Sequence, residues 1–220
     1  MIPFIASIIS AVSSLATTVG PVVSSFASTL VAKLPTIATT IVKVASVIVN
    51  VAQTFGLLNP GEDALTLGAK IGQEGTRGRM DGESMEDYFK YLREEVELDK
   101  ERLESMSEEE KIECQVVGTA MTSEAISEKT GVKLSPDFIA AMSKMEMTAA
   151  QLEAYVKAFS KQGTDSMDYL TKFLDGKLSD SALVEVYNIV DSVEKALDPS
   201  LDDNALQAKI DDMKNAIQPI

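Results

Sequence analysis

The sequence predicts an all-α protein, in which a hydrophobic, coiled-coil-like N-terminal helical segment interrupted by prolines precedes an acidic multi-helix domain. Three observations predict this class. Apolar residues within positions 1–58 recur in alternating steps of three and four, which is the spacing of a packed helix. Beyond position 82, apolar residues with helical spacing follow Ser or Thr residues typical of helix starts. Alternation with a period of two, which marks a strand, is missing from the sequence.

Charge is distributed unevenly along the 220 residues. The chain carries 20 basic and 34 acidic side chains, for a net charge of −14, and all of the acidic residues lie beyond position 58. We therefore expect hydrophobic helices for oligomerisation or membrane contact at 1–58, a Gly-rich linker region at 59–82 and an acidic all-α domain at 83–220. We expect the acidic part, residues 59–220, to fold without the apolar segment, residues 1–58. An acidic surface repels phosphates, so direct nucleic acid binding is not expected.

Prolines divide the apolar segment, because proline is tolerated in the first turn of a helix and breaks its interior. We expect helices near 3–19, 21–33 and 35–56. A seam of apolar residues runs along the third helix, with steps that alternate between three and four. Its residues are Leu34, Ile37, Ile41, Val44, Ile48, Val51, Phe55 and Leu58.

The composition of this seam indicates how the third helix packs. Ile and Val at most seam positions favour three or more helices around one axis, so we expect a homo-oligomer with a trimer preferred. The outer positions lack the charges of a water-exposed coiled coil and are expected to meet other proteins, a lumen or lipid. The alternative is a hairpin buried inside a larger helical core.

Local signals place the elements of the acidic part. Gly72, Gly75, Gly78 and Gly82 indicate a linker, and a phosphate-binding loop lacks both its strand and its Gly-Lys-Ser/Thr ending. Helix starts are predicted where a polar cap or a capping box precedes an apolar face. These starts are Asn59-Pro60, Ser84, Ser107 with Glu110, Ser135-Pro136, Thr148 with Gln151, Asp165, Ser179 or Asp180, and a last helix after Pro199.

Catalytic chemistry has few candidates in this sequence. There is no His, and Cys114 is the single cysteine, with apolar neighbours that indicate a buried thiol. Two glutamate-rich runs, at 94–97 and 108–113, are interpreted as solvated helix faces. The stretches DGKLSDS (175–181) and DPSLDDN (198–204) lack the ligand pattern of a calcium loop and are interpreted as caps and turns. We therefore expect a non-enzymatic protein without catalytic, cofactor-binding or metal-binding residues.

The apolar segment resembles known proteins in its composition. The stretch that begins MIPFIASIISAVSSLATTVG and ends TIATTIVKVASVIVNVAQTFGLL has only two charged residues, Lys33 and Lys43, and is similar to the hydrophobic helices of phage tape-measure and ejection proteins. Similar stretches occur in tailocins and contractile injection systems. The resemblance covers about a quarter of the chain and transfers no individual residue. It implies a structural or delivery component of a phage-like particle or injection machine, with oligomeric apolar helices that can contact a target membrane.

Two other classes of function remain open at this point. A membrane-active, pore-forming toxin or a chaperone-dependent secreted effector is the main alternative, and a cytosolic adaptor is the third. The stretches 1–32 and 34–58 are long enough to cross a bilayer. The N-terminus lacks the basic region of a signal peptide, so we expect cytoplasmic synthesis followed by association with a particle or a membrane.

Overall fold

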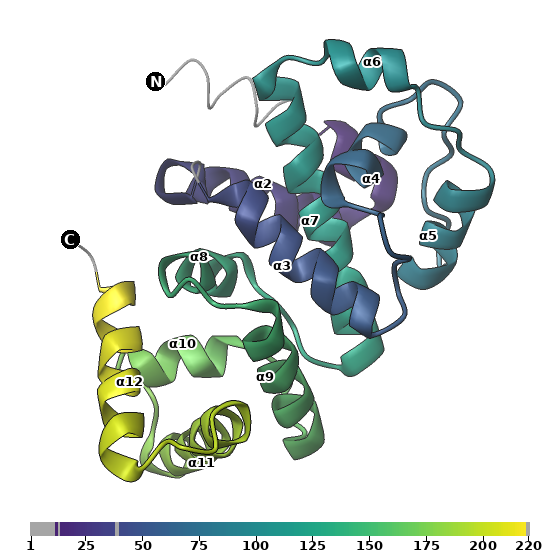
Figure 1. Ribbon diagram of the computed structural model, residues 1–220. Helices are drawn as coiled ribbons and strands as arrows, with labels where there is room; N and C mark the ends of the chain where they lie inside the picture. Colours follow the sequence, from purple (N-terminus) through teal and green to yellow (C-terminus); the bar gives the residue numbers. More distant parts are fainter. Residues whose placement is uncertain (1–11, 13, 38–39, 219–220) are drawn as a thin grey trace.

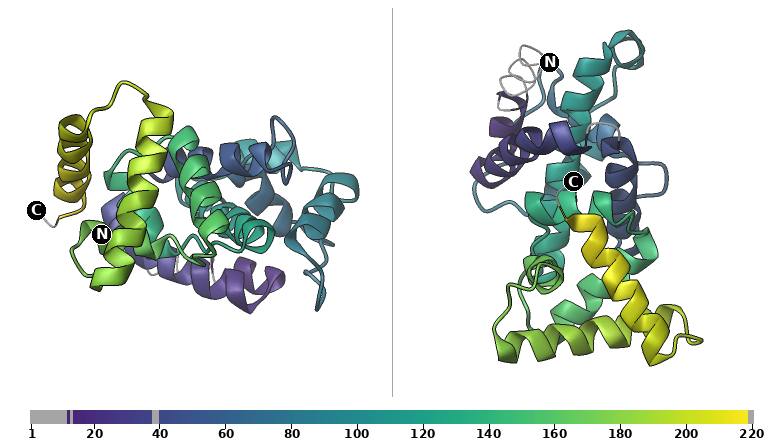
Figure 2. Two further views of the ribbon diagram at one scale, coloured as in Figure 1. Left: turned by 90° about the horizontal axis from the view of Figure 1, so that it is seen from below. Right: turned by 90° about the vertical axis from the view of Figure 1, so that its left-hand side faces the viewer.

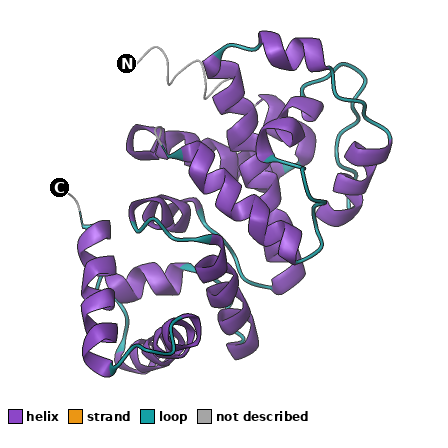
Figure 3. Ribbon diagram, in the orientation of Figure 1, coloured by secondary structure: helices purple, strands orange, loops and turns teal. Residues whose placement is uncertain are grey.

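The described part of the chain is helical throughout (Figure 1). The structure is a computed structural model that describes residues 12, 14–37 and 40–218. Among these residues there is no strand (Figure 3), and Lys133 forms an isolated parallel bridge with Ser166. The predicted all-α class is confirmed.

The helices form two groups that occupy opposite halves of the molecule, with α5 and α12 at opposite ends (Figures 1 and 2). Residues 14–19 are helical and precede the first group. That group comprises α2 (Pro21–Ile37), α3 (Ile41–Thr54), α4 (Ala64–Ile71), α5 (Met85–Glu94), α6 (Lys100–Ser105) and α7 (Glu108–Thr130). The second group comprises α8 (Pro136–Lys144), α9 (Ala149–Gln162), α10 (Asp168–Leu174), α11 (Asp180–Leu197) and α12 (Asp203–Ile217).

Several helix starts in the acidic part follow the predicted caps, whereas the start predicted at Asn59-Pro60 is wrong, because α4 begins at Ala64 with Asp63 as its cap. The Ser107 hydroxyl accepts a hydrogen bond from the Glu110 amide, and the Glu110 carboxylate accepts one from the Ser107 amide, at 3.2 and 2.8 Å. Thr148 and Gln151 form the second capping box, at the start of α9. Ser84 and Ser135 are simple caps of α5 and α8, since their hydroxyls accept hydrogen bonds from the amides of Asp87 and Phe138. These predictions are confirmed because each cap depends on a few neighbouring residues alone.

The boundary between α2 and α3 differs from the predicted one. We expected Pro35 to begin a helix, whereas α2 continues through Pro35 to Ile37 and α3 begins at Ile41. Proline removes one amide donor and obstructs the carbonyl four residues earlier. Within the last turn of a helix few hydrogen bonds remain to be lost, so the break follows the proline instead of preceding it.

Helix α7 is the centre of the first group and is buried on most of its circumference. It contacts α2, α3, α4, α5 and also α9. The hydroxyls of the buried Thr119 and Thr122 donate to carbonyls one turn earlier at 2.7 Å, whereas the buried Ser123 hydroxyl has no hydrogen-bond partner among the described residues. Buried side chains of the apolar segment and of the acidic part belong to one continuous cluster. The expected division into an apolar and an acidic domain therefore does not match the packing.

The segment expected to be a linker, 59–82, is part of this packing. It contains α4, which lies against α7. The following loop is held by Arg77, whose guanidinium donates to both carboxylate oxygens of Glu83 at 2.9 and 2.7 Å. The same guanidinium stacks 4.0 Å from the centre of the Tyr91 ring. The glycines of this segment thus allow tight turns within a fixed loop.

Candidate functional site

The predicted seam lies inside a single chain. Ile41, Val44, Ile48, Val51 and Leu58 are 3% exposed or less, and Phe55 is partly buried. The side chains of Leu34 and Ile37, both in α2, lie outside the part of the chain that the structure describes.

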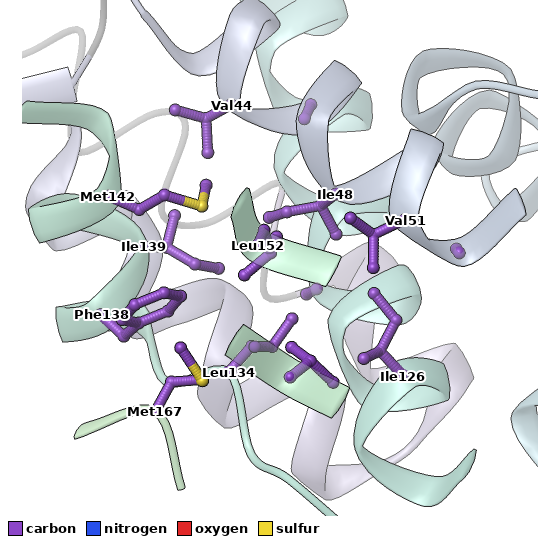
Figure 4. Close-up of a cluster of buried hydrophobic side chains, with 14 of the residues drawn as sticks. Val44, Ile48, Val51, Ile126, Leu134, Phe138, Ile139, Met142, Leu152 and Met167 are labelled. Atoms are coloured by element: carbon purple, nitrogen blue, oxygen red, sulfur yellow. The ribbon is translucent and has the colours of Figure 1, made fainter. Parts of the chain in front are cut away.

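Helix α3 carries this seam between the two groups of helices. It contacts α7 in the first group and α8 and α9 in the second. Figure 4 shows Val44, Ile48 and Val51 directed into a cluster of side chains from α7, α8, α9 and the segments beside them. The lack of charge on the buried sides of α3 is explained by this position, because two faces of the helix are buried at once. This packing corresponds to the alternative expectation, a hairpin buried inside a larger helical core. The trimer stays a prediction.

The outer faces of α2 and α3 are uncharged apart from one lysine. Lys43, on the outer face of α3, lies 3.3 Å from Glu146, and Lys33 in α2 is half-buried and lies 2.5 Å from Asp137. The exposed residues of the two helices are Pro21, Val22, Ser25, Thr29, Ala32, Val42, Lys43, Ser46, Asn50 and Thr54. We call these residues the uncharged face, which consists of an α2 part and an α3 part, each helix packing separately against α7 and α8.

Two grooves border the uncharged face. The α2 groove, of about 840 Å³, lies between α2, the end of α7 and the segments that begin α8 and α10. Its residues are Pro21, Val22, Ser25, Phe26, Thr29, Glu124, Ser127, Glu128, Gly131, Lys133, Leu134, Ser135, Pro136, Ser166 and Asp168. The α3 groove, of about 470 Å³, lies between α3 and the start of α4 and includes Val42, Ser46 and Asn50.

Most acidic groups of the α2 groove already have partners. One carboxylate oxygen of Glu128 accepts from the Arg79 guanidinium at 2.6 Å, and the other accepts from the Met85 amide at 2.7 Å. The carboxylate of Asp168 accepts a hydrogen bond from the Ser135 hydroxyl. Glu128 is thus paired with a cation, whereas the donor to Asp168 is a neutral hydroxyl.

Glu124 differs from these two carboxylates. Within the described residues it has no hydrogen bond or ion pair, although its side chain is only partly exposed. Burial raises the pKa of Glu124, and the neighbouring Glu128 carboxylate raises it further, against the opposing effect of Arg79 and Lys133. A carboxylate in this position favours a cation or a hydrogen-bond donor from outside the chain. This unpaired carboxylate could not be identified from the sequence, because Glu124 lies on α7 among alternating polar and apolar residues.

A smaller cavity of about 210 Å³ lies beside Cys114. Burial, and to a smaller extent the Glu113 carboxylate, raise the pKa of the Cys114 thiol to about 11, so the thiol is protonated at neutral pH. Burial also raises the pKa of Glu113, which is a correction to its interpretation as part of a solvated run. An unreactive thiol beside one carboxylate does not form a nucleophilic site.

The two stretches examined for calcium form caps and turns, as predicted. Asp198 accepts hydrogen bonds from the amide and the hydroxyl of Ser200, at 3.0 and 2.6 Å. Asp202 caps α12 by accepting from the Ala205 amide at 2.8 Å. No group of three or more His, Cys, Asp or Glu side chains placed to hold one metal ion occurs within the described ranges.

Comparison with protein families, curated proteins and solved structures finds no match for this chain. Among the described helices, none combines the length and the apolar character needed to cross a bilayer.

Proposed function

We propose that this protein is a non-enzymatic structural or delivery component of a larger protein assembly, such as a phage-like particle or an injection machine. It contacts the other proteins of that assembly through the uncharged face of α2 and α3. The observation that carries the proposal is the contrast between this face, with one lysine and no carboxylate, and a chain of net charge −14.

The composition of the uncharged face supports a contact with protein. Val22 and Val42 are 55% and 63% exposed, and the other exposed positions are mostly Ser, Thr, Ala and Asn. The cores of protein interfaces are depleted in charge, because an unpaired charge loses its hydration there. A surface without carboxylates on an otherwise acidic protein is therefore suited to burial in an interface with another protein.

The native mass of the protein tests this proposal. The full chain, tagged and produced in the cells that naturally make it, should migrate in a complex far heavier than the 23.7 kDa of one chain. Replacement of Val42 and Ser46 by Glu places two carboxylates on the outer face of α3, where both side chains are exposed. This double variant should fold normally and lose the complex.

A matched control separates the uncharged face from a general effect of added charge. Asn204 and Asn215 are exposed on α12, and their replacement by Glu adds the same charge at a distance from the face. The control variant should keep the complex. A wild-type protein of one-chain mass in its native cells, or an equal loss of the complex in both variants, would contradict the proposal.

Self-association and membrane contact are further parts of this proposal. Light scattering of the purified chain should give three times the mass of one chain if the preferred trimer forms, and the trimer is wrong if the mass is that of one chain. Co-sedimentation with vesicles of neutral and of anionic lipids tests the contact with a membrane. If the protein does not sediment with either kind of vesicle, the proposed contact with a membrane is wrong, and the proposed contact with other proteins is unaffected.

A further inference from the structure

The α2 groove has one apolar wall that is long and straight. Along α2 it runs from Pro21 through Val22 and Phe26 to Thr29. The eight residue steps from Pro21 to Thr29 correspond to about 12 Å of α-helix at 1.5 Å per residue. Leu134 and Pro136 add apolar surface on the other side of the groove. A wall of this length fits an extended or helical segment of a polypeptide better than a compact small molecule.

The opposite wall contains one carboxylate, that of Glu124, without a hydrogen bond or an ion pair among the described residues. Glu124, Glu128 and Asp168 line the groove with Lys133 as its one lysine or arginine, and Glu124 lacks a partner within the described residues. The Thr29 hydroxyl donates to the Ser25 carbonyl at 2.9 Å and the Ser127 hydroxyl to the Ser123 carbonyl at 2.8 Å. These hydroxyl donors are thus already used within the chain, and Glu124 is the polar group best placed to bind from outside.

We propose that the α2 groove binds a segment of a partner protein that carries a lysine or arginine beside apolar side chains. The apolar side chains pack on Val22, Phe26 and Leu134, and the cation pairs with Glu124. This inference rests on the proposed function, because it names the chemistry of one partner. A cation that pairs with Glu124 favours its ionised form, which burial and Glu128 disfavour in the free protein.

Binding of a designed peptide to the full chain tests the inference. The probe is a dye-labelled amphipathic peptide of Leu and Lys, about 14 residues or four helical turns long, and the readout is fluorescence anisotropy at physiological salt. A second peptide carries Glu in place of each Lys. We expect saturable binding of the Lys peptide and no binding of the Glu peptide.

Three single variants locate the binding. Glu124→Gln should weaken the Lys peptide about fivefold to tenfold and reduce the dependence on salt. Val22→Ser removes apolar surface from an exposed position and should weaken binding to a similar extent. Glu104→Gln removes the same charge from an exposed site on α6, outside the groove, and should leave the affinity unchanged.

Several outcomes would overturn the inference. They are an absence of saturable binding, equal binding of both peptides, and an equal effect of Glu124→Gln and Glu104→Gln. Spermine supplies cations without apolar surface, so full competition by spermine at the peptide's own concentration would also overturn it. A native complex that persists while the peptide fails to bind would reject this inference alone, and a monomeric native protein would reject the proposed function.

Discussion

Gly118 in α7 lies directly against the backbone of Ala64 in α4. A Cβ atom at Gly118 would come within 1.9 Å of the Ala64 carbonyl oxygen, which is far below any real contact. The relationship is reciprocal, because a Cβ atom at Gly68 in α4 would lie 2.0 Å from the Cys114 carbonyl oxygen in α7. At each of these two contacts, a glycine of one helix lies against the backbone of the other helix.

The first prediction concerns this crossing. Gly118→Ala should lower the free energy of unfolding by about 1–3 kcal/mol, because the helices must separate. The loss should exceed the gain of about 1 kcal/mol that alanine provides through its helix propensity. Gly72→Ala is the matched control, since its new methyl group would meet the tip of the Leu15 side chain at 3.1 Å. Urea denaturation should show a smaller loss for the control, and equal losses would contradict the close approach.

The second prediction tests the position of the seam. Ile48 is fully buried between the two groups of helices, so Ile48→Asp should lower the stability by about 4 kcal/mol or more. Val42→Asp, on the same helix and 63% exposed, should change it by less than about 0.5 kcal/mol. Thermal melts of both variants supply the comparison. Stability that rises with protein concentration would instead indicate that the seam is buried between chains.

The third prediction concerns the buried Glu194. Its carboxylate accepts a hydrogen bond from the Tyr155 hydroxyl at 2.7 Å and lies 2.5 Å from the Lys209 ammonium group, which joins α9, α11 and α12. Burial raises the pKa of Tyr155, so its hydroxyl keeps the proton that it donates. Tyr155→Phe should cost about 1–3 kcal/mol. Lys209→Met should cost about 3 kcal/mol, because it leaves a buried carboxylate without a cation. A larger loss in the first variant, measured by urea denaturation, would contradict this order.

The fourth prediction concerns Cys114. With its pKa raised to about 11, the thiolate is about 100-fold rarer at neutral pH than for an ordinary thiol of pKa 9.0. Labelling by a thiol reagent should be slow in the native protein and rapid in denaturant. The folded pKa exceeds the unfolded one, so the contribution of this thiol to stability is complete below pH 9 and is lost by about pH 11. Cys114→Ala should lack this part of the alkaline loss, and identical profiles would contradict the burial.

The fifth prediction reverses an expectation from the sequence. A fragment of residues 59–220 lacks α2 and α3, which both lie against α7. Removal of α2 and α3 exposes apolar surface of α7 that is buried in the full chain. We expect the fragment to lose its cooperative melt, as followed by far-ultraviolet circular dichroism. A fragment that melts as cooperatively as the full chain would restore the interpretation as an independent domain.

The sequence predicted those features that depend on near neighbours. The capping boxes at Ser107 and Thr148 are examples, because a serine or threonine and the side chain three residues later determine them. The periodicity at Ile41, Val44 and Ile48 likewise predicted which side of α3 is buried. Periodicity gives the buried side and says nothing of whether the covering helix comes from the same chain or another.

Other features depend on the tertiary arrangement and escaped prediction. Gly68 and Gly118 are far apart in the sequence, and each alone is an unexplained glycine in a helix. Glu124 gains its significance from α2, which forms the opposite wall of the groove. Pro35 indicated a break at the correct place in the chain but on the wrong side of the proline, because a helix tolerates a proline near its last turn.

The order in which the chain is synthesised has a consequence for α3. The helix is finished at Thr54, whereas α9, which covers one of its sides, ends only at Gln162. At about 5–20 residues per second, a ribosome needs roughly 5–20 s to supply that cover. During this interval a helix rich in Ile and Val, with Lys43 as its single charged residue, has left the ribosome without its partners. Newly made chains are therefore expected to depend on a chaperone, and to aggregate when synthesis outruns it.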